Sequence, residues 1–286
     1  MTLRAAFLSL AASTVLLAAC GGSTKDASTA TDLDVTLPGV DTSEFTARER
    51  HEFSTFVRQL PAPCKDVAVP VAQCVLEQRA CPVCVPAAQL IAKAVREGMS
   101  TEQVEDLYKQ RYDIGTSRAI PLTGSPFRGP EDAHVVVVEF ADFECPFCQK
   151  IAPELEAIWE KRRDKVRFVY KFMPLPMHPH GEIAARAGIA AQMQGKFWEM
   201  EKLLFGNGQN LEPADLERYA ASIGLDVEKF KADMQSPAAK ARIDADHKLG
   251  DDLHVKGTPT IFIDGREYDS KVDMGEWLDQ EIAARR

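Results

Sequence analysis

The most regular hydrophobic pattern in the chain is the run at residues 135–140, which reads Val-Val-Val-Val-Glu-Phe. A β-branched run of this kind is typical of a strand buried on both faces of a sheet, so we predict a central strand here. A second strand is predicted at residues 166–172, and the segment between them has apolar residues at helical spacing: Ile151, Leu155, Ile158 and Trp159. The order strand, helix, strand predicts a parallel pair joined by a crossover helix, and therefore the α/β fold class.

The segment from about residue 178 to 253 contains no strand pattern. Apolar residues at helical spacing instead predict helices at residues 183–193, 197–205, 213–223 and 237–249. We interpret this segment as a helical insertion in the α/β domain. The chain after it predicts a hairpin, with strands at residues 260–263 and 266–268 around an Asp-Gly turn, and then a closing helix around Trp277 and Leu278.

The N-terminal part of the chain predicts only helices. The first helix is predicted at residues 45–60, with Ser43 or Thr42 as its cap. Later boundaries are given by Pro86 as a first helical position, Gly98 as a helix end, and a capping box of Ser100 and Gln103. We therefore predict a small all-α domain at residues 43–118. A Gly/Pro-rich junction leads from it into the α/β domain, predicted at residues 119–286.

The first nineteen residues have the pattern of an export signal. Arg4 precedes an apolar run that is too short to span a bilayer, and Leu17-Ala18-Ala19-Cys20 follows. The segment resembles a bacterial lipoprotein signal, which implies that Cys20 becomes the lipidated first residue; a plain secretory signal with an incidental cysteine is the alternative. Residues 20–42 are rich in Ser, Thr, Gly and Asp and are predicted to be a flexible tether. We expect a lipid-anchored protein of the cell envelope that faces the periplasm, where disulfides persist.

Composition narrows the class of protein. The 286 residues are 45% hydrophobic and 27% charged, which is ordinary for a soluble globular chain. The formal net charge is −9, and no run rich in Lys and Arg is present, so we expect no nucleic acid partner. The seven cysteines fall into three groups, which suggests three separate roles.

Cys145-Pro146-Phe147-Cys148 is the strongest chemical motif. It follows the predicted central strand directly and opens a predicted helix. The unpaired backbone N–H groups and the positive end of the helix dipole favour a thiolate on the first cysteine. We therefore expect Cys145 to attack a disulfide and form a mixed disulfide, and Cys148 to resolve it. This chemistry needs no cofactor.

Two segments resemble the thioredoxin superfamily, and more specifically its DsbA-like branch. They are residues 139–148, with Pro153 downstream, and residues 255–265, which read Val-Lys-Gly-Thr-Pro-Thr-Ile-Phe-Ile-Asp-Gly. The resemblance implies a thioredoxin-like fold with a helical insertion. It also implies that Pro259 is a cis-proline that brings Thr258 beside the sulfurs, with a trans strand-start proline as the alternative. By the same resemblance Glu139 is a buried acid that exchanges a proton with Cys148; a solvated or paired acid at a strand end is the alternative.

Four more cysteines precede the α/β domain: Cys64, Cys74, Cys81 and Cys84. Two structural disulfides, in any of three pairings, would support a domain of this size. The segment at residues 81–112 also resembles the CcmH family of cytochrome c maturation thiol reductants, which implies a second redox pair at Cys81 and Cys84. A zinc site built from all four thiolates is the third alternative.

These patterns together predict a thiol-disulfide oxidoreductase that makes, breaks or shuffles disulfides in exported proteins through Cys145 and Cys148. A membrane redox partner is expected to recycle the pair. Two other functions stay open, namely a client-binding module without electron transfer and an apocytochrome c thiol reductant. The motif does not decide the direction of electron flow, because the reduction potential depends on how far the fold stabilises the thiolate.

Overall fold

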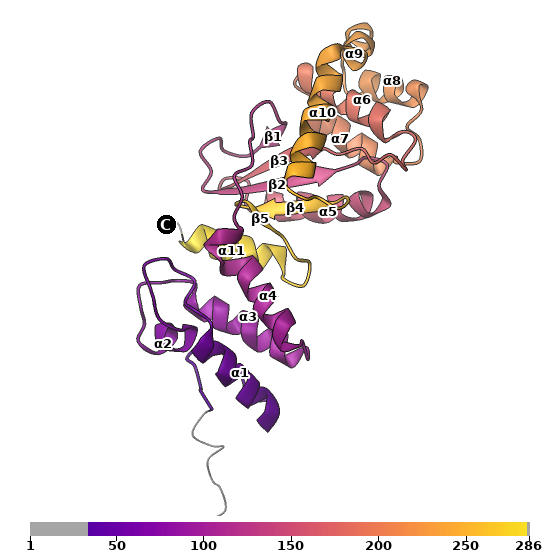
Figure 1. Ribbon diagram of the computed structural model, residues 1–286. Coiled ribbons are helices and arrows are strands. Elements are labelled where there is room, and N and C mark those ends of the chain that lie inside the picture. Colours follow the sequence, from indigo (N-terminus) through magenta and orange to yellow (C-terminus); the bar gives the residue numbers. More distant parts are fainter. Residues whose placement is uncertain (1–33, 285–286) are drawn as a thin grey trace, which may run out of the picture.

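The computed structural model describes residues 34–284 (Figure 1). The predicted signal peptide and Cys20 lie outside the described residues. The last part of the predicted tether lies inside them and packs against the helical domain, where Leu37 and Val40 are buried. The tether prediction was therefore too long at its C-terminal end, because these two apolar side chains join the core.

The α/β domain is built on a five-stranded sheet with the order β1-β3-β2-β4-β5. Its strands are β1 (Phe127–Arg128), β2 (Val135–Ala141), β3 (Val166–Phe172), β4 (Thr260–Ile263) and β5 (Arg266–Glu267). The predicted central strand is β2, which runs parallel to β3 and antiparallel to β4. In this register Glu139 lies opposite Tyr170 on one side and Ile261 on the other.

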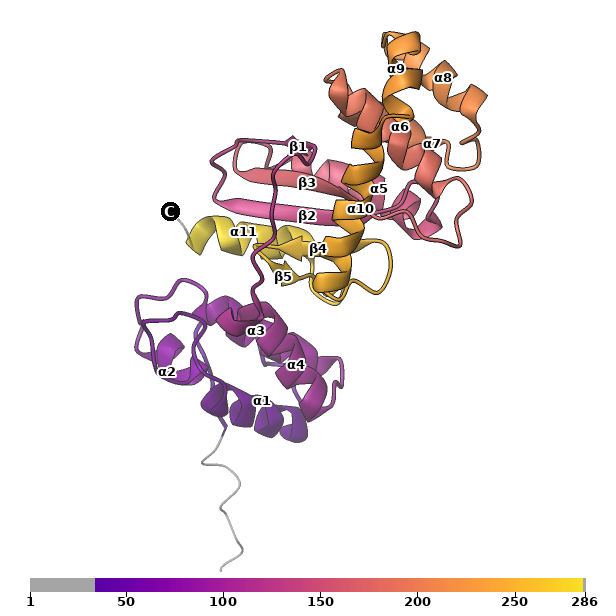
Figure 2. The same ribbon diagram turned by 45° about the horizontal axis from the view of Figure 1, so that its top comes forward.

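Helices cover both faces of the sheet. The crossover helix α5 (Pro146–Glu160) and the closing helix α11 (Met274–Ala284) pack on the face that carries Val137 and Phe168. The opposite face, which carries Val138 and Phe140, packs against Leu249 and Leu253 at the end of α10 (Figure 2). The sheet is therefore enclosed between two helical layers, as its continuous apolar strands require.

The helical insertion forms a separate lobe beyond one end of the sheet (Figure 1). It consists of α6 (Gly181–Met193), α7 (Phe197–Gly206), α8 (Pro213–Ser222), α9 (Val227–Met234) and α10 (Pro237–Asp252). The sequence prediction missed α9, which is a short helix capped by Asp226. Its eight residues bury only Phe230 and Met234, which is too little to give a periodic pattern.

The N-terminal domain contains four α-helices among its described residues. They are α1 (Ala47–Gln59), α2 (Val71–Leu76), α3 (Cys84–Arg96) and α4 (Thr101–Tyr112). The predicted capping box of Ser100 and Gln103 is confirmed. The cap of α1 was predicted wrongly: Thr46, whose hydroxyl accepts from the Glu49 N–H, takes the place of Ser43 or Thr42. Pro86 is not a first helical position either, because α3 begins two residues earlier, at Cys84.

Two disulfides cross-link this domain, Cys64–Cys81 and Cys74–Cys84, with Cα–Cα distances of 5.7 and 6.1 Å. The Cys74–Cys84 bond joins α2 to the first residue of α3. Cys81 and Cys84 are each bonded to another cysteine, so they do not form the separate redox pair that the CcmH resemblance implied. Because all four sulfurs are oxidised here, they offer no thiolates to the zinc ion of the third alternative.

A shared core joins the helical domain to the sheet. Apolar side chains of α1, α3 and α4 form one cluster with those of α5, α11 and the sheet face between them. The Arg111 guanidinium of α4 donates to Glu281 of α11 at 2.6 Å and lies over the rings of Tyr112 and Trp277, with centroids at 4.7 and 4.4 Å.

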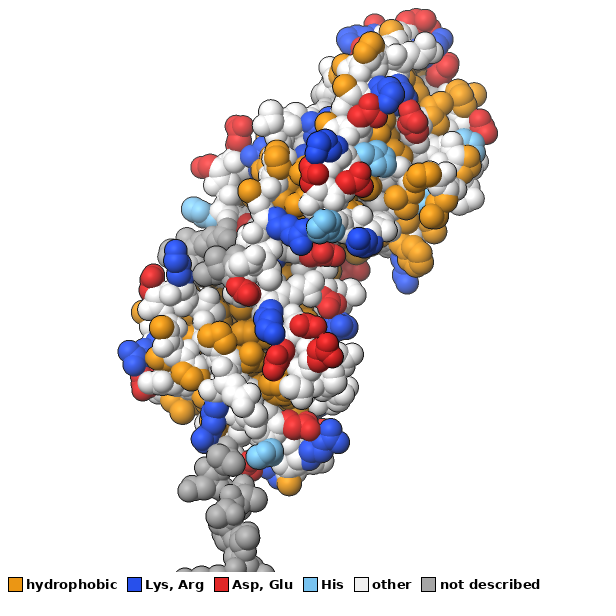
Figure 3. All heavy atoms as spheres, viewed as in Figure 1, with side chains coloured by type: hydrophobic (Ala, Val, Ile, Leu, Met, Phe, Trp, Pro, Cys, Tyr) orange, Lys and Arg blue, Asp and Glu red, His pale blue; other side chains and the backbone are white. Residues whose placement is uncertain are grey.

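None of the helices in residues 34–284 is both long and apolar enough to cross a membrane. Acidic and basic side chains are interspersed over the face in Figure 3.

Candidate active site

The end of β2 leads directly into the start of α5, and this turn carries the two cysteines. The Cys145 N–H donates to the carbonyl of Asp142 at 3.1 Å, and Cys145 is the N-cap of α5. Pro146 follows at the first helical position, where its missing N–H costs no hydrogen bond. No side chain caps this helix, so the backbone N–H groups of its first turn remain available to a thiolate on Cys145.

The two thiols are free and differ in their surroundings. Cys145 Sγ lies 3.3 Å from the Thr258 carbonyl oxygen, to which it donates. Cys148 has no exposed surface, and burial raises the pKa of its thiol far above the usual range, with the charge of Glu139 adding to the shift. A hydrogen bond from the Asp142 backbone opposes this shift. Cys148 is therefore held as a neutral thiol, which must lose a proton before it attacks.

Glu139 is a carboxyl group that can take this proton. It is buried on β2, on the sheet face that α5 covers, and its charge acts on Cys148. Burial and, to a smaller extent, the negative charge of Glu201 raise its pKa, the positive charge of Arg128 opposes them, and the net value is about 8. Glu139 is thus a buried acid and not a solvated one, and it changes protonation state near neutral pH.

The loop before β4 completes the site. The Thr258–Pro259 peptide bond is cis, as the family resemblance implies. Thr260 begins β4, which pairs with β2 at Phe140, and its hydroxyl donates to the Gly257 carbonyl at 2.8 Å. The pairing of β4 with β2 brings this loop beside Cys145, so the structure collects Cys145, Cys148, Glu139, Thr258 and Pro259 at one end of the sheet.

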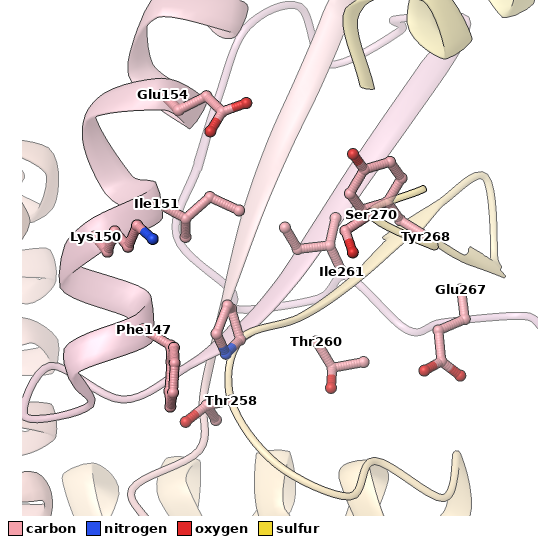
Figure 4. Close-up of a pocket in the computed structure, with 11 residues that line it drawn as sticks. Phe147, Lys150, Ile151, Glu154, Thr258, Thr260, Ile261, Glu267, Tyr268 and Ser270 are labelled. Carbon is pink, nitrogen blue, oxygen red and sulfur yellow. The ribbon is translucent and has the colours of Figure 1, made fainter. Parts of the chain in front are cut away.

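A groove of about 550 Å³ runs beside this site, between α5 and the β4–β5 hairpin (Figure 4). Phe147, Ile151 and Glu154 line it from α5, and Thr258, Thr260 and Tyr268 line it from the opposite side. Phe147, which lies between the two cysteines in the chain and lines the groove, is a large apolar side chain that is 70% exposed. The groove therefore offers an extended, partly apolar surface with carbonyl and hydroxyl groups along one wall.

Asp142 is a structural residue of the site that sequence reasoning did not single out. Its carboxylate is buried and accepts the backbone N–H groups of Glu144 and Leu175 at 2.9 and 2.8 Å. Its Oδ2 also lies 2.6 Å from Nδ1 of His178. A polar residue directly after a buried strand was the available signal. These bonds tie the cysteine turn to the loop that enters the helical insertion.

A family model described as thioredoxin matches residues 122–280, which hold the whole sheet, the cysteine pair and the helical insertion. The chain belongs to this thioredoxin family. Within this fold the structures it resembles include a thioredoxin-like oxidoreductase from Silicibacter pomeroyi DSS-3. That protein is 29% identical, with a TM-score of 0.51 over 57% of this chain and 93% of the other.

Two further structures of the thioredoxin fold match at lower identity. BdbD from Bacillus subtilis is 22% identical, with a TM-score of 0.54 over 59% of this chain and 98% of its own. The thiol-disulfide exchange protein α-DsbA2 from Wolbachia pipientis is 17% identical, with a TM-score of 0.51 over 70% and 98%. The predicted DsbA-like thioredoxin fold is confirmed. The sequence predicts an oxidoreductase, which is also how the Silicibacter structure is described.

The curated relatives with similar sequences are much longer proteins. An Na⁺/H⁺ antiporter NhaA 3 from Salinispora tropica is 42% identical over 142 residues, and an NhaA from Herminiimonas arsenicoxydans is 41% identical over 146 residues. These matches cover 49% and 51% of this chain but only 22% and 23% of the antiporters. The antiporter name belongs to those longer chains.

Proposed function

We propose that this protein exchanges dithiols for disulfides in exported proteins through Cys145 and Cys148, from a lipid anchor at Cys20 that faces the periplasm. The observation that carries the proposal is the pair of adjacent free thiols at the start of α5, beside a groove of about 550 Å³. The family and the oxidoreductase resemblance support the chemistry, and the export signal in the sequence supports the location.

The geometry gives each cysteine its part in the exchange. In the reducing direction, a Cys145 thiolate attacks a client disulfide, forms a bond to one client sulfur and releases the other as a thiolate. Cys148 then transfers its proton to Glu139 and attacks Cys145 Sγ. The Cys145–Cys148 bond forms, the mixed disulfide breaks, and the client leaves reduced. The oxidising direction is the reverse, and Glu139 then returns the proton to Cys148.

The groove wall formed by the cis-proline loop and β4 is proposed to bind the client as an added strand. Backbone groups give affinity in this mode, and side chains such as Phe147 contribute apolar contact. Clients are therefore proposed to be unfolded or extended segments of exported proteins. Each exchange with a client leaves the Cys145/Cys148 pair in the opposite redox state. A membrane redox partner is proposed to restore the starting state, so that the enzyme can turn over again in the same direction.

Active-site substitutions test this function. We expect Cys145→Ser to abolish turnover of insulin or a disulfide peptide, and Cys148→Ser to accumulate mixed disulfides that mass spectrometry detects, because the resolving thiol is missing. Binding of clients by the unaltered protein without any turnover would instead identify a client-binding module and overturn the proposal. Equilibration of the unaltered protein with glutathione then gives the direction: a potential well above that of the glutathione pool identifies an oxidase, and a thioredoxin-like value a reductase or isomerase.

A further inference from the structure

A second buried carboxyl group, Glu201 of α7, lies near the active site and has no part in the exchange just described. Phe197, Glu201 and Phe205 follow one another at four-residue spacing, so they lie on one face of α7. The rings of Phe197 and Phe205 lie 5.2 and 6.3 Å from the ring of Tyr170. Glu201 is therefore held between two rings that both contact Tyr170, and only 8% of its surface is exposed.

Tyr170 lies close to both carboxyl groups, because the charges of Glu139 and Glu201 both raise the pKa of its hydroxyl. Tyr170 and Glu139 lie directly opposite each other on β3 and β2, and adjacent strands are about 4.8 Å apart. Among the described residues, neither the Tyr170 hydroxyl nor Oε1 of Glu139 has a hydrogen-bond partner, although both atoms are buried. Polar atoms in such positions are the usual binding places of internal water, which passes protons between groups that do not touch.

Arg128 is the positively charged neighbour of the buried polar cluster formed by Glu139, Tyr170 and Glu201. The register of β1 with β3 puts Arg128 on the same sheet face as Glu139 and Tyr170. Its guanidinium is fixed over the rings of Trp159 and Trp198, with centroids at 4.2 and 4.4 Å. Its positive charge lowers the pKa of both Glu139 and Glu201 against the effect of their burial.

A cavity of about 360 Å³ between α5 and α7 reaches Glu201 from the surface. Gln149, Glu156 and Lys202 also line it. Glu156 forms ion pairs with Arg128 and with Lys202, the second at 2.6 Å. Glu201 is therefore the point at which the buried polar cluster meets a cavity with charged walls.

We propose that Glu201 is a positioning residue for the exchange reaction. It carries protons between Glu139 and the surface cavity through Tyr170 and internal water. The inference rests on the proposed role of Glu139. When Cys148 gives its proton to Glu139 and bonds to Cys145, Glu139 passes one proton through Tyr170 to Glu201, which releases it into the cavity. The reverse reaction takes up one proton by the same route, so Glu139 is reset after each turnover.

The pKa values of Glu139 and Glu201 allow a proton to pass between the two carboxyl groups. Burial raises the pKa of Glu201 to about 7, close to the value of about 8 for Glu139, so a proton moves between the two carboxyl groups at little cost. The titratable and charged groups that face the route are Arg128 from β1, Glu139 from β2, Asp142 from the turn directly after β2, Tyr170 from β3, Cys148 and Glu156 from α5, and Lys202 from α7.

The test is the pH profile of the Cys148 step in Glu201→Gln, measured by stopped-flow on the mature full-length protein in dilute buffer. We expect this step to slow about tenfold or more, as for the loss of a proton-transfer group. Added imidazole is expected to restore the rate, because it enters the cavity and replaces the carboxyl group. The apparent pKa of Glu139 in the profile is expected to fall, since the Glu201 charge no longer raises it.

Matched variants separate this role from a structural one. Glu199→Gln changes an exposed carboxyl of the same helix, which pairs with Lys196, and is expected to behave as the unaltered protein. Tyr170→Phe removes only a hydroxyl from the route and is expected to repeat the loss, also if Glu201→Gln fails to fold. Imidazole is not expected to restore this variant, because it enters the cavity at Glu201 and does not replace the buried hydroxyl. Unaltered profiles in the folded variants, or a loss in Glu201→Gln that imidazole does not restore, would overturn the inference. Absence of turnover in the unaltered protein would count against the proposed function instead.

Discussion

Glu139 is the residue whose environment departs furthest from what its position in the chain suggests. It is a carboxyl group that directly follows a run of four valines, and the pairing of β2 with both β3 and β4 leaves it only 7% exposed. The same burial that makes it a proton acceptor near neutral pH makes it costly to ionise. Function and stability therefore oppose each other at this one side chain.

This conflict predicts a pH-dependent stability. The pKa of Glu139 is about 8 in the folded protein against 4.5 for an exposed glutamate, so the folded state binds more protons between these values. The free energy of unfolding therefore falls as the pH rises from about 4.5 to 8, by at most roughly 5 kcal/mol from this group. We expect Glu139→Gln to gain stability over the unaltered protein at pH 8.5 and to differ least near pH 4.5. Urea denaturation at both pH values measures this, with exposed Glu228→Gln as the control; an equal effect at both would contradict it.

The short elements of the N-terminal domain depend on their cross-links more than on their own length. α2 has six residues, which is fewer than an isolated helix needs. The Cys74–Cys84 disulfide joins α2 to α3. The Cys64–Cys81 disulfide joins the loop before α2 to the loop before α3. The chain between the bonded cysteines spans 17 and 10 positions.

The disulfides are therefore expected to be structural. Loops of this length give about 3 kcal/mol for each bond in the chain-entropy description. We expect Cys74→Ser/Cys84→Ser to lower the free energy of unfolding by about this amount, measured by urea denaturation. A Cys145→Ser/Cys148→Ser protein provides the reference, because reductant then acts only on the structural bonds. If reductant leaves its unfolding unchanged, the bonds do not support the domain. Slower turnover in Cys81→Ser/Cys84→Ser at full stability would restore the hypothesis of a second redox pair.

The whole molecule is held together by a buried ionic contact within a shared apolar core. Arg111 reaches across from α4 to Glu281 on α11, and Arg266 adds a more distant contact at 3.8 Å. The redox site and the cross-linked cysteines lie at separate places, since α2 and the start of α3 are on the side of the helical domain away from α5 (Figures 1 and 2). The two groups are therefore not in direct contact in this structure.

The contact at Arg111 is expected to govern how firmly the two parts dock. Arg111→Met leaves the Glu281 carboxylate buried beside a weaker partner, so we expect a loss of about 3–5 kcal/mol and faster proteolysis near residues 113–126. Arg111→Met/Glu281→Gln removes both charges and is expected to recover part of that loss. Arg48→Ala, which breaks the exposed pair with Glu52, is the control. A loss in Arg111→Met no larger than in this control would mean that the contact does not hold the domains.

The sequence by itself determined the elements whose signals are local. The valine run, the Cys-Pro-Phe-Cys turn, the Ser100 capping box and the Asp264-Gly265 hairpin each depend on neighbouring residues, and the structure has them where the patterns indicated. Contacts between distant residues were decided only by the tertiary structure. The pairing of four cysteines had three solutions of equal local merit, and Glu201 and Arg128 gave no local sign of a connection with Glu139. Their positions follow from strand register and helix packing, which bring together side chains that are separated by tens of residues in the chain.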